Sequence, residues 1–183
     1  LEQLIERQRS SNIELFYNSN MTHLPEKAFI LWKNFKKVSV SASIDDIGDR
    51  NHYIRYPASW KKIEMHVAKI LDHGLILDVT KTVSAMNLFY LDEMLAWAQT
   101  RKIHVEYNFV YDPPFLAPKA LPQVVRKELL KNEKFQTMAS ARQRHQLEAI
   151  ASEEDSPELW EQFVSYTKTL DQSRKQDFQK TFP

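Results

Sequence analysis

The sequence contains no cysteine among its 183 residues. The chain therefore has no disulfide, no Cys-ligated zinc site, no cysteine nucleophile and no cysteine ligand for an iron–sulfur cluster. Glycine occurs only at Gly48 and Gly74, so neither a G-x-G-x-x-G fingerprint nor a P-loop is present. These absences exclude the two commonest glycine-rich phosphate-binding loops.

Excess charge and long hydrophobic runs are also missing. The chain carries 25 Lys+Arg and 24 Asp+Glu, a net charge of +1, which gives no electrostatic reason to expect nucleic acid or an anionic membrane as partner. No stretch approaches about 18 uncharged apolar residues, and no signal-peptide pattern is present. With 43% apolar and 27% charged residues, the composition predicts a globular chain with a core, which we expect to be cytoplasmic.

The first two thirds of the chain alternate between strand-like and helix-like segments. Strands are predicted at 13–20, 37–43, 75–83 and 103–110, and helices from about 25, at 59–72 and at 88–100. Each connection between strands is long enough for a helix, which predicts parallel strands with right-handed crossovers. Beyond Pro113 the sequence becomes helical, with helices predicted at 122–133, 136–151 and 157–180. We therefore divide the chain into a β/α part, 1–121, and a C-terminal helical extension, 122–183.

The predicted strands alternate between apolar and polar residues. One face carries residues such as Val40, Val79 and Val105, and the other carries Ser41, Ser43, Asp78, Thr80, Thr82, His104, Glu106 and Asn108. Parallel strands covered on both faces usually read as continuous apolar runs, and a closed barrel fills its lumen with Val, Ile and Leu. The pattern predicts an α/β fold, a partial open TIM-like (β/α) barrel of about four parallel strands whose lumen binds a polar ligand. The alternative is an amphipathic sheet with one face in solvent.

The densest polar cluster follows the second predicted strand, in the segment SIDDIGDRNHYIRYP at 43–57. In parallel β/α folds, the carboxyl ends of the strands and the loops after them form the site. Ser43 and Asp45 lie two residues apart and are expected on one side, and Arg55 could reach back as a bidentate carboxylate clamp. The alternative is a turn whose Asp side chains cap backbone amides.

Carboxylates near the strand ends suggest a second kind of chemistry. Asp45, Glu106 and Asp112 could provide an acid/base pair, as in a β/α-barrel hydrolase that uses Asp45 and Glu106. The six histidines show no metal-binding spacing such as H-E-x-x-H. No metal site is therefore predicted within this chain.

Four segments in order carry a family resemblance: YNSNMT at 17–22, SASIDDIG at 41–48, NHYIRYPASW at 51–60 and TVSAMN at 82–87. Together they resemble the later part of the radical S-adenosylmethionine (radical SAM) barrel, and within it the twitch-domain-containing radical SAM proteins. The similarity runs from about residue 13 to 122, with a family-like tail through Asp171, Arg174 and Phe182-Pro183.

The resemblance implies a partial (β/α)6 barrel of which this chain supplies strands three to six. Enzymes of the family bind a 4Fe–4S cluster through a CxxxCxxC loop and cleave S-adenosylmethionine to a 5′-deoxyadenosyl radical, which abstracts a substrate hydrogen. A peptide or protein substrate is expected by analogy with neighbouring groups. By family position, Ser43 would hydrogen-bond S-adenosylmethionine and Arg55 would pair with its carboxylate. Asn20 and Asp45 would lie near the cosubstrate, and Glu106 and Asn108 on the substrate side.

The chain departs from the family in lacking the three-cysteine loop and the glycine-rich strand end. Both would lie upstream of Leu1 if the chain is the C-terminal portion of such an enzyme, and the absence of an initiator Met favours that interpretation. A cluster-free half-barrel binding or scaffold protein is the alternative, and the hydrolase is a further one. The missing upstream strand would leave residues 13–20 at an open edge, so we expect the chain alone to behave poorly or to dimerise.

Overall fold

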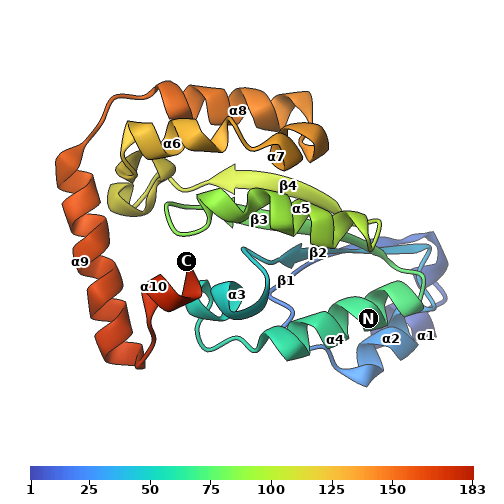
Figure 1. Ribbon diagram of the computed structural model, residues 1–183. Coiled ribbons are helices and arrows are strands. Elements are labelled where there is room, and N and C mark those ends of the chain that lie inside the picture. The colour runs from blue at the N-terminus through green and yellow to red at the C-terminus, as the bar shows by residue number, and fades with distance from the viewer.

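A computed structural model describes all residues, 1–183, and shows an α/β fold built on a four-stranded parallel sheet. The strands are β1 (Glu14–Ser19), β2 (Lys37–Ser43), β3 (Ile76–Val83) and β4 (His104–Phe109). They lie side by side in the order β1-β2-β3-β4, so each strand pairs with the next along the sequence (Figure 1). The predicted parallel sheet followed by C-terminal helices is confirmed.

Helices connect the strands as the spacing predicts. They are α1 (Glu2–Glu6), α2 (Glu26–Trp32), α3 (Gly48–Ile54), α4 (Trp60–Asp72) and α5 (Leu91–Gln99), with 3-10 turns at Ser10–Asn12 and Leu88–Tyr90. Gly74 ends α4 at φ +67°, a left-handed conformation in which glycine has no Cβ penalty. Helix α3 lies within the polar segment 43–57, where no helix was predicted, and it follows a turn in which Asp46 caps the Ile47 amide. The single helix predicted at 88–100 begins as a 3-10 turn and becomes α5 only at Leu91.

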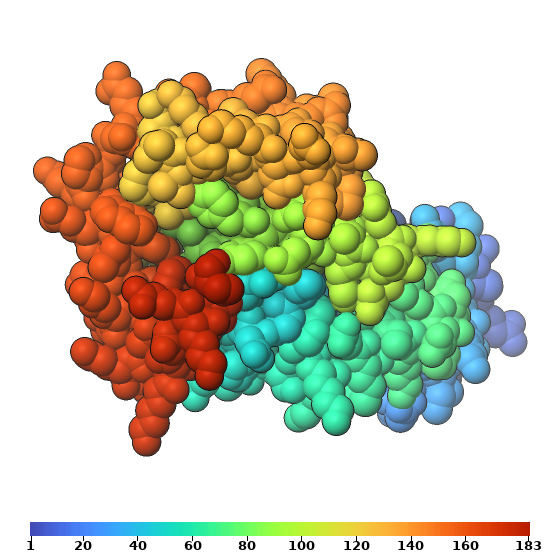
Figure 2. All heavy atoms as spheres, viewed as in Figure 1, coloured from blue at the N-terminus to red at the C-terminus, as the bar shows by residue number.

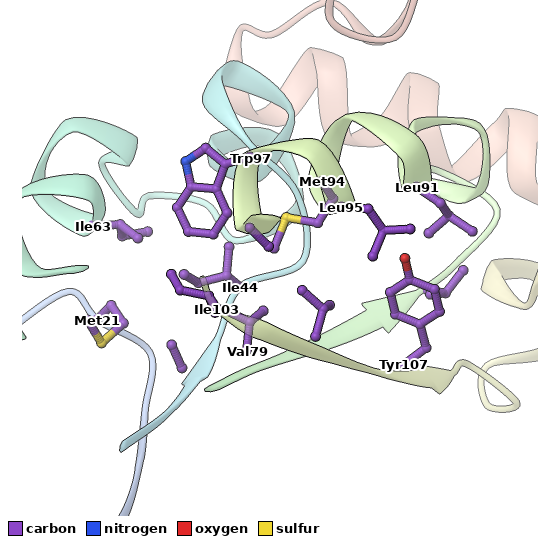
Figure 3. Packing of buried hydrophobic residues seen from close by; sticks show 14 of the residues in the cluster. Met21, Ile44, Ile63, Val79, Leu91, Met94, Leu95, Trp97, Ile103 and Tyr107 are labelled. Atoms are coloured by element: carbon purple, nitrogen blue, oxygen red, sulfur yellow. The ribbon is translucent and has the colours of Figure 1, made fainter. Parts of the chain in front are cut away.

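One face of the sheet is covered by helices and forms the core. A single cluster of 34 buried residues joins Val40 and Val79 of the sheet to Ile63 of α4 and Leu91 of α5. Figure 3 shows side chains of α5 facing Val79 and Tyr107, with the Tyr107 ring directed toward the helix. The predicted apolar face is therefore the buried one.

The C-terminal extension contains more helices than expected. After 3-10 turns at Pro114–Leu116 and Pro118–Ala120 come α6 (Gln123–Leu129), α7 (Glu133–Met138), α8 (Ala141–Ser152), α9 (Pro157–Arg174) and α10 (Phe178–Thr181). The predicted helix at 136–151 is divided because Ser140 forms a capping box with Gln143 and starts α8. The helix predicted to reach 180 ends earlier, because Lys175 adopts a left-handed φ of +54°. None of the helices is both long and apolar enough to cross a membrane.

The two edges of the sheet differ. Helices α6 to α8 lie beyond β4 (Figure 1), and Gln143 of α8 donates a hydrogen bond to the carbonyl of Val105 at 3.3 Å. Strand β1 pairs only with β2, so its outer edge has no strand partner. Phe16 of β1 is 73% exposed. The sheet is thus covered at one edge and open at the other.

Candidate functional site at the end of strand β2

The loop after β2 places two carboxylates at the carboxyl end of the sheet. Asp45 is only 5% exposed: its Oδ1 accepts a hydrogen bond from the Thr82 amide at 2.8 Å, and its Oδ2 accepts one from Arg55 Nε at 2.6 Å. The Asn51 side-chain oxygen, on α3, accepts from the amides of Asp45 and Asp46 at 3.2 and 3.3 Å. The short helix α3 therefore fixes the loop and brings Arg55 back to Asp45.

Arg55 is held at one nitrogen and free at the others. Its side chain makes one hydrogen bond within the chain, from Nε to Asp45, and is 26% exposed. A guanidinium presents five N–H donors in a fixed plane, so a group held through Nε keeps its two terminal nitrogens for a carboxylate. Arg55 is therefore oriented by the protein and available to an anionic ligand.

Beneath this pair lies a second, fully buried ion pair. Lys81 and Asp46 both have no exposed surface, and Lys81 Nζ lies 3.8 Å from Asp46 Oδ2. Lys81 Nζ also donates a hydrogen bond to the main-chain carbonyl of Asp45. Asn87 donates to the same carbonyl at 2.7 Å and to the carbonyl of Thr82 at 2.9 Å. Two buried donors thus converge on the carbonyl of Asp45.

The buried ion pair is incompletely compensated. Asp46 Oδ1 accepts from the Ile47 amide at 2.8 Å and from Arg50 Nε at 3.0 Å, but Asp46 Oδ2 has no hydrogen-bond partner. Burial raises the pKa of Asp46 above 3.8, although Lys81 and Arg50 oppose the change. Burial likewise lowers the pKa of Lys81 below 10.5, against the attraction of Asp46 and Asp45. The two pKa shifts have one cause, because the loss of hydration destabilises each charged form more than the attraction between the two charges stabilises it.

Arg50 connects the buried pair to the surface. Besides Asp46, it donates to Glu93 of α5 at 2.5 Å, and its guanidinium carbon lies 4.0 Å from the centre of the Tyr90 ring. The side chain of Arg50 is 14% exposed. The charges therefore run in a line from Lys81 through Asp46 and Arg50 to Glu93, and tie α3 to α5.

The C-terminal segment packs against the other side of α3. The buried Tyr53 hydroxyl donates to Asp171 at 2.9 Å, and Arg174 donates to the Tyr53 carbonyl at 3.0 Å. The Arg174 guanidinium carbon lies 5.2 Å from the centre of the Tyr56 ring. The end of the chain lies next to α3 in Figure 2. Helices α9 and α10 thus hold the segment from which Arg55 projects.

The other predicted site residues lie on the uncovered polar face. Ser43 is half-buried and pairs across the sheet with Thr80, which in turn pairs with Glu106. The neighbouring hydroxyls of Ser41 and Thr80 are hydrogen-bonded at 2.9 Å. Ser43, Thr80 and Glu106 therefore form one row across three strands.

Glu106 and Asn108 are exposed on β4, and Glu106 contacts His104 at 3.3 Å. Asn20, after β1, is exposed and caps a turn by accepting from the Thr22 amide at 3.1 Å and hydroxyl at 2.7 Å. The structure brings Asp45 and Arg55 together and aligns Ser43 with Glu106. Asn20 remains apart at the end of the outer strand.

Sequence reasoning missed the residues that organise the site: Lys81, Asn87, Asn51 and Asp46. The side chain of Asn87 donates to the carbonyls of Asp45 and Thr82 and accepts from the Ser84 amide at 2.8 Å. The strand alternation did contain a signal for Lys81, which shares the parity of Val79 and Val83 and so lies on the buried face.

A large groove borders this cluster at Arg50 and Glu93. It has a volume of about 820 Å³ and is bordered by α3, α4, α5 and the C-terminal segment, with Arg50, Trp60, Glu93, Trp97 and Lys180 among its lining residues. Most of its lining is polar or charged, and Arg50 and Glu93 are paired with each other. No group of three or more His, Cys, Asp or Glu side chains is placed to hold a metal ion.

Comparisons of the chain with protein-family models, with curated proteins and with solved structures found no match.

Proposed function

We propose that this chain is the C-terminal portion of a radical SAM enzyme and binds the S-adenosylmethionine of that enzyme at the carboxyl end of β2. The observation that carries the proposal is Arg55, held by Asp45 through Nε with its terminal nitrogens free. A carboxylate is the natural partner of such a fork, and S-adenosylmethionine carries one on its methionine part.

The uncovered face of the sheet supports the same proposal. Ser41, Ser43 and Thr80 place hydroxyls on that face, close to the strand ends where parallel β/α folds bind ligands. Hydroxyl groups both donate and accept hydrogen bonds, as recognition of ribose or an amino group requires. Glu106 and Asn108, one strand further on, would face the substrate, which we propose to be a peptide or protein.

The cluster of the family does not fit the residues of this chain. The sequence contains no cysteine, and no alternative group of metal ligands is formed. The 4Fe–4S cluster would therefore require ligands from residues outside 1–183. The unpaired edge of β1 offers a place for a further strand carrying them, because its outer backbone groups have no strand partner.

Binding of S-adenosylmethionine tests the proposal directly. Equilibrium dialysis of the purified chain with radiolabelled S-adenosylmethionine should show saturable binding, and Arg55→Gln should weaken it by about 10- to 100-fold, the cost of losing hydrogen bonds to a charged group. Arg142→Gln is the matched control, because Arg142 is exposed and makes no ion pair. Absence of binding, or equal binding by the Arg55 variant, would refute the proposal.

A cluster-free binding or scaffold protein remains the second candidate, favoured by the contiguous core of 34 residues within this chain. The gene sequence separates the two: an encoded CxxxCxxC segment upstream of Leu1 supports the enzyme, and a stop codon directly before Leu1 supports the binding protein. The hydrolase receives less support, because Asp45 is only 5% exposed and is held by Arg55 and Thr82. A general base must lie within reach of the proton that it removes.

A further inference from the structure

We infer that Lys81 is a positioning residue: its buried ammonium holds the Asp45 carbonyl and thereby fixes the Asp45 carboxylate that orients Arg55. This inference deepens the proposed function, because the ligand that Arg55 would meet is the carboxylate of S-adenosylmethionine. Lys81 itself touches no ligand, since it is fully buried on the helix-covered face of the sheet.

The first step of the argument is the unusual location of Lys81. A lysine with no exposed surface is rare in a protein core, and leaving it there charged is costly unless it is paired. The chain compensates the charge with Asp46, at 3.8 Å, and with the carbonyl of Asp45. Replacing both Lys81 and Asp46 by apolar residues of similar volume would avoid this cost, so stability alone does not explain the pair.

The second step is the short path from Lys81 to Arg55. Lys81 donates a hydrogen bond to the main-chain carbonyl of Asp45. The Asp45 carboxylate accepts a hydrogen bond from Arg55 Nε at 2.6 Å. The Asp45 carboxylate is also tied to the Thr82 amide at 2.8 Å, one residue after Lys81 in β3. Lys81 therefore holds the main chain of Asp45, and the Thr82 amide holds its side chain. The position of the Asp45 carboxylate in turn fixes the orientation of Arg55.

The third step concerns the other hydrogen bonds of Asp45, which all come from within the chain. Asn87 supports the Asp45 carbonyl from the far end of β3, and Asn51 binds the Asp45 amide from α3. All the polar groups of Asp45 are thus satisfied by the chain. Arg55 is the partly exposed member of the network that keeps free donors, because the unpaired side-chain nitrogen of Asn51 is buried. Such outer partners commonly fix the orientation of a ligand-binding side chain.

The test uses the double variant Lys81→Met/Asp46→Asn, which removes both buried charges at once and so avoids a lone charge in the core. In the ¹H–¹⁵N spectrum of the full chain, the Arg55 Nε–H signal, assigned by its loss in Arg55→Gln, should be sharp and shifted by its bond to Asp45. The double variant should broaden or move that signal while its unfolding stays cooperative. An unchanged Arg55 signal in the folded double variant would overturn the inference, whether or not S-adenosylmethionine binds.

Ligand affinity supplies the second measurement. With S-adenosylmethionine as the probe, the double variant should bind about tenfold more weakly, the lower range of effects seen when an outer partner of a ligand group is removed. In an Arg55→Gln background the same two changes should have no further effect, because their influence passes through Arg55. Equal losses in the two backgrounds would show a general structural role and would contradict positioning. Failure of the wild-type chain to bind would refute the proposed function but leave the spectroscopic result standing.

Discussion

The two faces of the sheet differ in whether their charged side chains are exposed to solvent or buried. On the open face, His104 and Glu106 are exposed and lie 3.3 Å apart, and a polar contact between exposed side chains contributes little. On the covered side, Lys81 and Asp46 are fully buried, and their charges are compensated only by each other and by neighbouring groups of the chain. The difference shows that one sheet can carry a face that tolerates charged side chains and a face on which each buried charge needs a partner.

The largest effect should come from breaking the buried pair. Lys81→Met leaves the buried Asp46 with Arg50 as its remaining cationic partner, and we expect a loss of about 3 kcal/mol in the free energy of unfolding at neutral pH, the lower end of the cost of breaking a buried pair. Adding Asp46→Asn should restore most of the loss, because no buried charge then remains. Urea unfolding of the wild type, the single variant and the double variant measures these free energies. Unchanged stability of Lys81→Met would show that the covered face tolerates an unpaired charge.

The same variant should have a predictable pH dependence. Burial already raises the pKa of Asp46 in the folded chain, and removing Lys81 raises it further. The folded state then binds a proton more tightly than the unfolded state, so stability is greatest below the unfolded pKa and is lost as the pH rises through the folded one. The deficit of Lys81→Met should therefore be smaller at about pH 5 than at pH 7. A larger deficit at the lower pH would contradict this assignment.

Two substitutions that change no charge, one on each face of β3, sharpen the comparison between the faces. Val79→Ala removes buried apolar surface from the covered face and should cost about 2 kcal/mol. Thr82→Ala, three residues later on the open face, should change stability by less than about 0.5 kcal/mol, because the bond to Asp45 comes from the Thr82 main chain. Thermal or urea unfolding compares them, and equal losses would indicate that the polar face is also packed.

The smallest effect on stability should come from Phe16, whose exposed ring extends the open face to the unpaired edge of β1. We expect the wild-type chain to self-associate through this edge, and Phe16→Lys to reduce the oligomeric fraction with little change in stability. Ile30→Lys, which removes a comparably exposed side chain from α2, is the control. Light scattering after size exclusion measures both, and a monodisperse wild-type monomer would weaken the case for a missing strand.

The sequence predicted the sheet well because strand alternation and helix spacing are local signals. Val38, Val40 and Ala42 point to one face of β2 as expected, and Gly74 ends α4. The organisation of the site was less predictable. Helix α3 begins at Gly48, a residue typical of turns, and forms because its Tyr53 packs against segments more than a hundred residues away. Lys81 was also missed, since its role depends on Asp45 and Asp46 across the sheet.

The order in which this chain folds follows from one feature of the sheet. Each strand lies beside its neighbour in sequence, so the sheet can grow by short-range steps, whereas the bond from Tyr53 to Asp171 closes a separation of 118 residues. Late closure of long loops is expected on grounds of chain entropy. Tyr53→Phe should accordingly accelerate unfolding and leave the refolding rate nearly unchanged in stopped-flow experiments. The C-terminal helices would then slow unfolding and so set the lifetime of the folded segment that carries Arg55.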